Sequence, residues 1–229
     1  MRNFIILLLL VSIVPVKIRA QQMPYYRMSA DFTIKEKNTD GRSSLTMGRV
    51  YYDSFYKKIV YSIRFPEKET WLFYDTSMYK IAGKDMTSYH VMPGFVDFSI
   101  FNLALNNNLK NYGLQKSVYT MKKVEKDEDL VISTWVPRKE VEKKLGILKI
   151  AVGENKLNGI IFYDPKNKII GKQLFTNYAN LGGFEFPTEI MNYSYRDDGS
   201  EIHQLTTYKN IKVNNWDENS FYNYPVPGK

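Results

Sequence analysis

The 229-residue chain contains no cysteine and only two histidines, His90 and His203. Without cysteine it can form no disulfide, no thiolate zinc site, no cysteine nucleophile and no thiol-linked lipid anchor. Two histidines far apart in the sequence do not indicate a metal site or a catalytic base, and we interpret each as an ordinary strand or loop residue. The fold must therefore be held together by the burial of apolar side chains, which a chain of this length can achieve.

The sequence also lacks the short motifs that mark common catalytic sites. It has no glycine-flanked serine elbow, no phosphate-binding loop, no dinucleotide fingerprint and no HExxH pair. Its acidic pairs, such as Asp197 with Asp198, lie in turn-like segments where carboxylates are solvated. Acid–base catalysis needs two carboxyl groups whose surroundings give them different pKa values, and solvated carboxylates lack such surroundings. We therefore expect a protein that is not an enzyme, with no catalytic residue, no metal and no cofactor.

Long hydrophobic runs are absent except at the N-terminus. There Arg2 precedes an apolar run over residues 4–16, and a short basic stretch then leads to the small residue Ala20. This pattern predicts a secretory signal peptide over residues 1–20, followed by a single domain over residues 21–229. A membrane anchor is the alternative, but it would need about 20 apolar residues, and this run is shorter and contains a proline. We expect an exported protein, periplasmic in a Gram-negative cell.

The charge of the chain is basic but dispersed. The formal net charge is +8 at pH 7, and the lysines are scattered among acidic residues, as between Lys122 and Asp129. A solvated surface explains this distribution, and attraction to anionic lipid headgroups is the alternative. No basic residues gather into a clustered face, so we expect no binding to nucleic acid.

Aromatic residues are abundant, with 18 tyrosines and 13 phenylalanines, and many alternate with polar residues between turn signals. Such alternation is typical of β-strands. We expect strands at residues 30–34, 45–52, 59–65, 69–75, 130–136, 147–152, 157–163, 169–177, 186–195 and 201–209. The regular spacing predicts one long antiparallel sheet of about ten or eleven strands, curled or closed into a barrel.

One segment, FSIFNLALNNNL at residues 98–109, departs from the strand pattern because its apolar residues recur at helical spacing. Asp97 and Ser99 are candidate N-caps, and Gly113 is a candidate terminator. Asparagines dominate the opposite face, where Leu103 is out of place. The predicted apolar face consists of Phe98, Ile100, Phe101, Ala104, Leu105, Leu109 and Tyr112. Such a helix could close one end of the core, lie on a membrane surface, or cover an apolar cavity.

Two strands are apolar or aromatic on both faces, at residues 71–74 (WLFY) and 160–163 (IIFY). A sheet that is apolar on both sides needs cover on both sides. Helices of the chain itself can supply this cover, and so can a hydrophobic ligand bound in a cavity.

Two groups of segments resemble the LolA/LolB-like lipoprotein carrier family, and together they extend from Ser29 to Tyr224. The first group is ADFT (30–33), GRVYY (48–52), YSIRFPE (61–67) and WLFYDT (71–76). The second group is FPTEI (186–190) and TTYKNIKVN (206–214), followed by Phe221. In that family a glycine-led strand precedes strands that end at a proline and an aspartate turn, and a proline-led strand and a valine–asparagine strand come last.

The resemblance implies a mainly β (α+β) fold, in which a strongly curved antiparallel sheet forms an incomplete β-barrel with short helices over its concave face. It also implies an apolar cavity that binds the acyl chains of lipoproteins. The expected cavity wall is Phe32, Ile34, Ile59, Tyr61, Ile63, Trp71 and Phe73, and the expected lid helix carries Phe98, Phe101 and Leu105. A register error of one residue would replace the whole wall set with its neighbours.

The sequence departs from the family pattern at one point. The periplasmic carriers have an arginine on the strand after the leading glycine, which holds the helical lid closed. The comparable residues here are 51–54 (YYDS), and the nearby Arg49 and Arg64 do not match that position.

We therefore expect a monomeric, non-enzymatic carrier of acylated lipoprotein or another lipid. A handover protein of the inner or outer membrane is a possible partner. The alternative is a lipid-sensing regulatory or protein-interaction module with the same fold.

Overall fold

A computed structural model describes residues 25–228, so the expected signal peptide (1–20) and residues 21–24 lie outside the described residues. In the described part, 13 strands form one antiparallel sheet. The strands are β1 (Arg27–Lys37), β2 (Ser43–Asp53), β3 (Lys58–Phe65), β4 (Glu69–Tyr74), β5 (Ser77–Ala82), β6 (Asp85–Val91), β7 (Tyr119–Asp127), β8 (Leu130–Pro137), β9 (Leu148–Gly153), β10 (Lys156–Tyr163), β11 (Ile169–Leu181), β12 (Phe184–Tyr195) and β13 (Glu201–Val213). The helices are α1 (Ile100–Leu105), α2 (Asn219–Tyr222) and a 3₁₀ turn, η1 (Leu114–Lys116).

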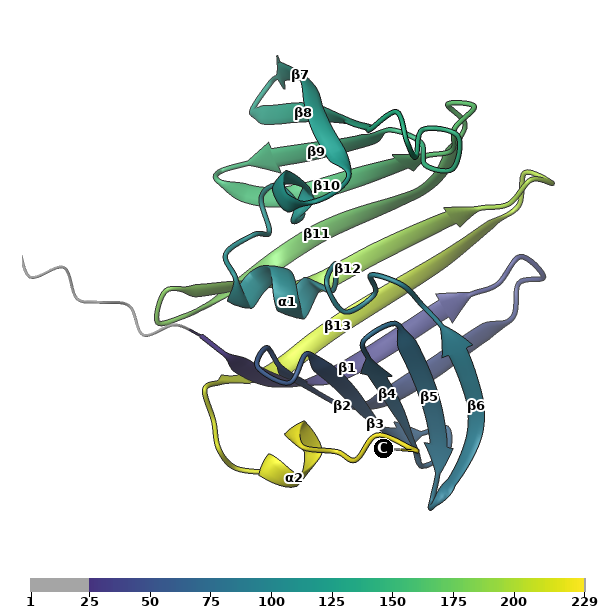
Figure 1. Cartoon of the computed structure of the whole chain (residues 1–229), viewed down its shortest axis with the longest axis vertical. Helices are drawn as coiled ribbons and strands as arrows, with labels where there is room; N and C mark the ends of the chain where they lie inside the picture. Colours follow the sequence, from purple (N-terminus) through teal and green to yellow (C-terminus); the bar gives the residue numbers. More distant parts are fainter. Residues whose placement is uncertain (1–24, 229) are drawn as a thin grey trace, which may run out of the picture.

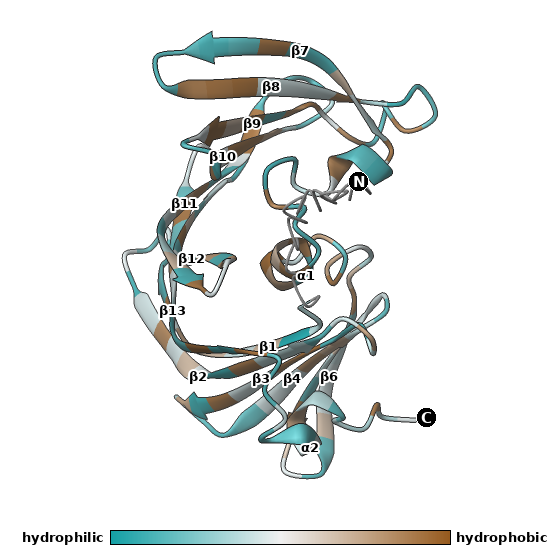
Figure 2. Ribbon diagram, turned by 90° about the vertical axis from the view of Figure 1, so that its left-hand side faces the viewer, coloured by the Kyte–Doolittle hydropathy of each residue, from teal (hydrophilic) through white to brown (hydrophobic). Residues whose placement is uncertain are grey.

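The sheet consists of two meanders, β1–β6 and β7–β13, which are joined where the first strand, β1, pairs with the last strand, β13. β1 pairs with both β2 and β13, while β6 and β7 form the two free edges of the sheet. The sheet curls around α1 without closing, so that the helix lies on the concave side (Figures 1 and 2). The predicted fold class, an incomplete antiparallel barrel with short helices over its concave face, is confirmed, although 13 strands exceed the ten or eleven expected and α2 packs on the outer face.

The three additional strands are β5, β6 and β7. β6 and β7 lie at the edges and are almost wholly exposed, so their sequences carry no alternation of buried and exposed residues. β5 buries only Met78 and Ile81, which are separated by the half-buried Tyr79 and Lys80. Edge strands are shielded by charged and polar side chains, which hides them from hydrophobic pattern analysis.

Gly48 shows why a glycine stands at the start of the GRVYY segment. The register between β2 and β3 shifts between Met47 and Gly48, and a Cβ atom on Gly48 would lie 2.1 Å from the backbone carbonyl oxygen of Ser62. Only a residue without a side chain allows the two backbones to approach this closely. Gly48 is therefore needed where the register between β2 and β3 shifts.

The outer face of β2–β4 is covered by the end of the chain. Tyr51, Val60 and Leu72 form a second buried cluster with Tyr222 of α2 and with Val226. This cover explains why the WLFY strand is apolar on both faces. The other strand of this kind is different, because the outer-facing Ile161 and Tyr163 of β10 line an open hollow of about 860 Å³.

A buried ion pair fastens this covering segment. Arg27 Nη2 lies 2.7 Å from Asp53 Oδ2, and both side chains are almost fully buried. Arg27 also donates to Asn219 Oδ1 at 3.0 Å, and the Trp216 ring lies 4.1 Å from its guanidinium carbon. A buried charge pair is costly to break, because either partner alone is left uncompensated.

Helix α1 is shorter than the predicted segment of residues 98–109. Ser99 is the N-cap, accepting a hydrogen bond from the Asn102 backbone at 3.2 Å, and the helix ends at Asn106. The predicted terminator Gly113 does not end α1, since it precedes η1 with a φ of 70°. Leu103 is not on a solvated face as predicted: it is 1% exposed, because the returning chain places Gly113 against it. No helix within residues 25–228 has the length and apolar character needed to cross a bilayer.

Candidate functional site: a cavity under helix α1

A cavity of about 650 Å³ lies between α1 and the concave face of the sheet. Its apolar lining is largely aromatic and comes from both halves of the sheet and from the segment around α1. The main apolar lining residues are Ile34, Tyr61, Trp71, Phe73, Phe95, Phe98, Phe101, Tyr112, Phe162, Phe175, Ile190 and Tyr208. A second cavity of about 410 Å³ lies by the C-terminal end of α1, beside Leu105 and Leu109.

All seven expected wall residues belong to the inner cluster that packs with α1, and their neighbours Val60 and Leu72 belong to the outer one. Only part of the set reaches the cavity. The residues that line it are Ile34, Tyr61, Trp71 and Phe73. The residues that lie in the packed core instead are Phe32, Ile59 and Ile63, each at most 3% exposed. The role of this set in binding a ligand stays a prediction.

The expected lid residues are divided between the two cavities. Phe98 and Phe101 line the larger one, while Leu105 lines the smaller one. Phe101 is the main anchor of α1, being 2% exposed. Its ring centroid lies within 6.3 Å of those of Tyr52, Tyr61, Phe186 and Tyr208. Aromatic pairs at these distances stabilise a contact beyond the area that they bury.

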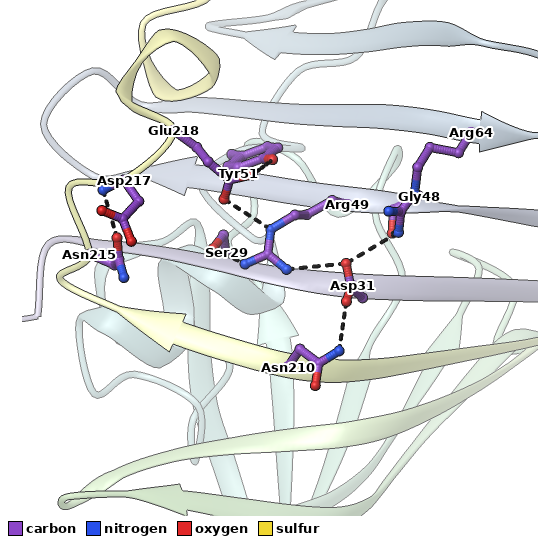
Figure 3. Close-up of polar contacts among 10 residues, drawn as sticks. All are labelled: Ser29, Asp31, Gly48, Arg49, Tyr51, Arg64, Asn210, Asn215, Asp217 and Glu218. Carbon is purple, nitrogen blue, oxygen red and sulfur yellow. Dashed lines mark hydrogen bonds and ion pairs between the residues drawn. The ribbon is translucent and has the colours of Figure 1, made fainter.

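Arg49 and Arg64, the arginines near the segment at residues 51–54, do not contact α1. Both side chains bond to groups on the outer side of the sheet (Figure 3). Arg49 binds Asp31 Oδ1 at 3.1 Å and Ser29 Oγ at 2.8 Å, and its Nε lies 3.3 Å from Glu218 Oε2. These contacts tie the C-terminal segment to β1 and β2, so Arg49 supports the sheet from behind.

Tyr52, within the segment where the family has its arginine, makes the polar contact between the sheet and α1. Its hydroxyl donates a hydrogen bond to Asn102 Oδ1 at 2.7 Å. Burial, together with the nearby carboxylates of Asp97 and Asp53, raises the pKa of Tyr52 above its ordinary value, so the hydroxyl stays protonated. Asn102 also donates to the Asp97 carbonyl at 2.7 Å. Sequence reasoning missed this contact, since it placed the asparagines of the helix in solvent.

Two buried tyrosines extend the cavity lining. Burial raises the pKa of Tyr61 and Tyr208 above the ordinary tyrosine value, and the two hydroxyls are hydrogen-bonded to each other. Burial also raises the pKa of Tyr112 to about 12. Within residues 25–228, no group of three or more histidine, aspartate or glutamate side chains is placed to hold a metal ion. Lys172 is the only charged side chain among the described residues that line the cavity, so the rest of the lining is uncharged and suits an apolar ligand.

The second half of the sheet supplies polar lining that the sequence did not predict. Gln173, Asn192, Gln204 and Thr206 of β11–β13 face the cavity next to Phe175 and Ile190. The inward positions of these strands alternate regularly, which is the signal that could have identified them. Their residue types are polar, so a search for an apolar wall passed over them.

Comparison with known proteins identifies solved structures that share the fold of this chain. No family model and no curated protein matches the sequence. Three solved structures match with a TM-score of 0.58: a LolA superfamily protein from Nitrosomonas europaea, a DUF1329 family protein from Desulfovibrio piger and a putative outer membrane lipoprotein-sorting protein domain from Vibrio parahaemolyticus. Their identities are 12%, 13% and 11%, and the matches cover 87%, 86% and 86% of this chain and 91%, 90% and 90% of theirs. The resemblance to LolA-like proteins is therefore confirmed as a shared fold, a curved open sheet with a helix on its concave side.

Proposed function

We propose that the protein is a non-enzymatic carrier, exported to the periplasm, that holds an acyl chain of a lipoprotein or of another lipid. The observation that carries this proposal is the aromatic-lined cavity of about 650 Å³ between α1 and the sheet. Cavities of about 300–1,000 Å³ with mostly apolar linings are the usual binding sites for small hydrophobic ligands. The shared fold with a putative lipoprotein-sorting protein domain supports the same class of cargo.

Binding in this site would be driven by removal of apolar surface from water. Each buried CH₂ group contributes about 0.8 kcal/mol, so a chain that is poorly soluble in water can be held in a preformed cavity. No covalent chemistry is required of the lining residues. Release would then require displacement of α1 or transfer to a membrane-bound handover protein.

The contacts of α1 suit a movable cover. The helix has six residues, one buried aromatic anchor in Phe101 and one hydrogen bond from Tyr52 to its polar face. A single hydrogen bond contributes about 0.5–1.5 kcal/mol net, which acyl-chain burial can offset. The larger share of the attachment is the packing of Phe101.

Native mass spectrometry of the protein purified from its own envelope tests the proposal. A co-purifying lipid or acylated protein is the expected result. An apo mass under gentle conditions, together with no binding of a fluorescent fatty-acyl probe, would refute it.

The site itself is tested with Phe101→Glu, which places a charge beneath α1, against Phe55→Glu as a matched control. Phe55 is 82% exposed at the β2–β3 turn and does not line the cavity. We expect Phe101→Glu to abolish probe binding and Phe55→Glu to preserve it. Unchanged binding in both variants would assign α1 a purely structural role.

A further inference from the structure

A row of polar side chains crosses the concave face at the level of the cavity. Gln173 of β11 is paired with Asn192 of β12, and Asn192 is paired with Gln204 of β13. Gln204 is in turn paired with Glu36 of β1. We call the three amides the amide row (Gln173, Asn192 and Gln204); all three line the cavity.

The hydrogen bonds along the amide row have one direction, and Glu36 sets it. An ionised carboxylate only accepts, so Gln204 presents its amide nitrogen to Glu36 Oε2, at 3.1 Å. The Gln204 carbonyl oxygen then faces Asn192, which donates to it at 3.3 Å. At the other end, the Tyr112 hydroxyl donates to Gln173 Oε1 at 3.3 Å.

This direction leaves one acceptor and one donor free at neighbouring positions. Asn192 Oδ1 is buried and has no hydrogen-bond partner among the described residues. The Gln173 carbonyl is used by Tyr112, so its amide nitrogen is the group that remains to donate. A buried carbonyl without a partner costs free energy, and a ligand that donates to it would remove that cost.

The row next to the amide row on the cavity side is mostly apolar. The adjacent row consists of Phe175, Ile190, Thr206 and Ile34, paired in the same order across the four strands. Lys172 borders both this cavity and the outer hollow, and its ammonium group lies 5.8 Å from the Tyr195 ring. An anionic headgroup at the amide row would place its oxygens against the free carbonyl of Asn192, and two acceptors cannot bond to each other.

We propose that the amide row selects the linkage of the bound amphiphile, favouring an uncharged group that both donates and accepts one hydrogen bond. A secondary amide or a hydroxyl next to the acyl chain has this chemistry, whereas an ester only accepts and a carboxylate is charged. Asn192 Oδ1 accepts from the ligand, and the Gln173 amide nitrogen donates to it. This inference rests on the proposed lipid carrier function and names the class of lipid.

Probes with a common chain length test the inference in a displacement assay with a fluorescent fatty-acyl reporter on the delipidated protein. The probes are N-methylpalmitamide, hexadecanol, methyl palmitate and palmitate. We expect N-methylpalmitamide or hexadecanol to bind about fivefold or more tightly than methyl palmitate, which corresponds to one hydrogen bond. We expect palmitate to bind no more tightly than the ester. This comparison needs only the wild-type protein.

Two variants on different strands locate the preference. Asn192→Leu removes the acceptor and Gln173→Met removes the donor, while Met191→Leu on the outer side of β12 is the control. We expect Asn192→Leu to reduce the preference to near unity, Gln173→Met to weaken amide, alcohol and ester alike and keep the preference, and the control to change neither. Glu36→Gln, which frees the direction of the row, should weaken the preference and leave ester binding unchanged.

The outcomes separate the two proposals. If no probe binds, the carrier function is refuted. If all probes bind with equal affinity, or palmitate binds best, the linkage preference is overturned while the carrier function stands. If Asn192→Leu weakens all probes equally, the amide row is structural and the inference fails.

Discussion

Replacing Phe101 with alanine tests how α1 is held on the sheet. The Phe101 ring is 2% exposed and is surrounded by the rings of Tyr52, Tyr61, Phe186 and Tyr208. No other side chain of α1 has as many aromatic contacts in the described structure. We therefore expect this substitution to weaken the attachment of the helix more than any other change within it.

The magnitude follows from the size of the ring and the nature of the space that it leaves. Truncating a buried phenylalanine to alanine costs about 3–5 kcal/mol, and the cost is greatest where the surroundings cannot relax. Here the vacated space opens onto the cavity of about 650 Å³, so the substitution leaves no sealed void, and the part of the cost that comes from a void is smaller. We expect the free energy of unfolding to fall by about 3 kcal/mol, at the lower end of this range.

Urea denaturation followed by tryptophan fluorescence measures this loss, with Phe55→Ala as the control. Phe55 is 82% exposed, so its removal should change the free energy of unfolding by less than about 0.5 kcal/mol. Hydrogen exchange gives a local readout at the Leu103 amide, which donates to the Ser99 carbonyl at 3.0 Å. A helix of six residues is too short to be stable alone, so this amide should exchange faster once the anchor is lost.

Two results would refute this reasoning. A loss below about 1 kcal/mol for Phe101→Ala, close to that of Phe55→Ala, would show that the ring contacts contribute little. Unchanged exchange at Leu103 in a clearly destabilised variant would show that α1 remains docked through other contacts. In that case Phe101 would serve the core of the sheet and not the cover.

Three further predictions concern the hydrogen bond from Tyr52 to α1, the close backbone approach at Gly48 and the buried phenol of Tyr112. Tyr52→Phe should lower the free energy of unfolding by about 1 kcal/mol and speed exchange in α1, because Asn102 loses a hydrogen bond from the sheet. Gly48→Ala should destabilise by about 1–3 kcal/mol in urea denaturation, because its Cβ would overlap the Ser62 carbonyl. Burial raises the pKa of Tyr112 to about 12, so the unfolded chain releases the phenol proton first as the pH rises above about 10. The stability that this group contributes should be complete below pH 10 and decline as the pH approaches 12, as measured by denaturation at fixed pH.

The first half of the sheet was largely predictable because its chemistry is local. Ile59, Tyr61 and Ile63 alternate with residues of the other face, so the sequence alone separates the two faces of β3. The same alternation does not report depth. Ile59 and Ile63 are sealed in the core while Tyr61 lines the cavity, since that difference depends on what lies above each residue.

The second half of the site depends on contacts between distant segments. The amide row joins Glu36 to Gln204, which are 168 positions apart, and exists only because β1 pairs with β13 in one register. Likewise, Leu103 is buried because the chain returns past Gly113. A helical wheel cannot show that this returning segment packs on the helix, so the predicted solvated face wrongly included Leu103.

The cavity has a firmly held wall and a lightly held cover. Behind the wall, Arg27 pairs with the buried Asp53 and donates to Asn219 of the C-terminal segment, and Phe221 stacks on Tyr51 with ring centroids 4.7 Å apart. In front, α1 is held chiefly by Phe101 and by the hydrogen bond from Tyr52. The cover is held by apolar packing worth about 3 kcal/mol at Phe101 and by a hydrogen bond worth about 1 kcal/mol, both of which acyl-chain burial can offset, whereas breaking the buried ion pair would cost about 3–5 kcal/mol and leave an uncompensated charge. If the cavity takes a lipid as proposed, its entry should therefore displace α1 and leave β1–β4 in place.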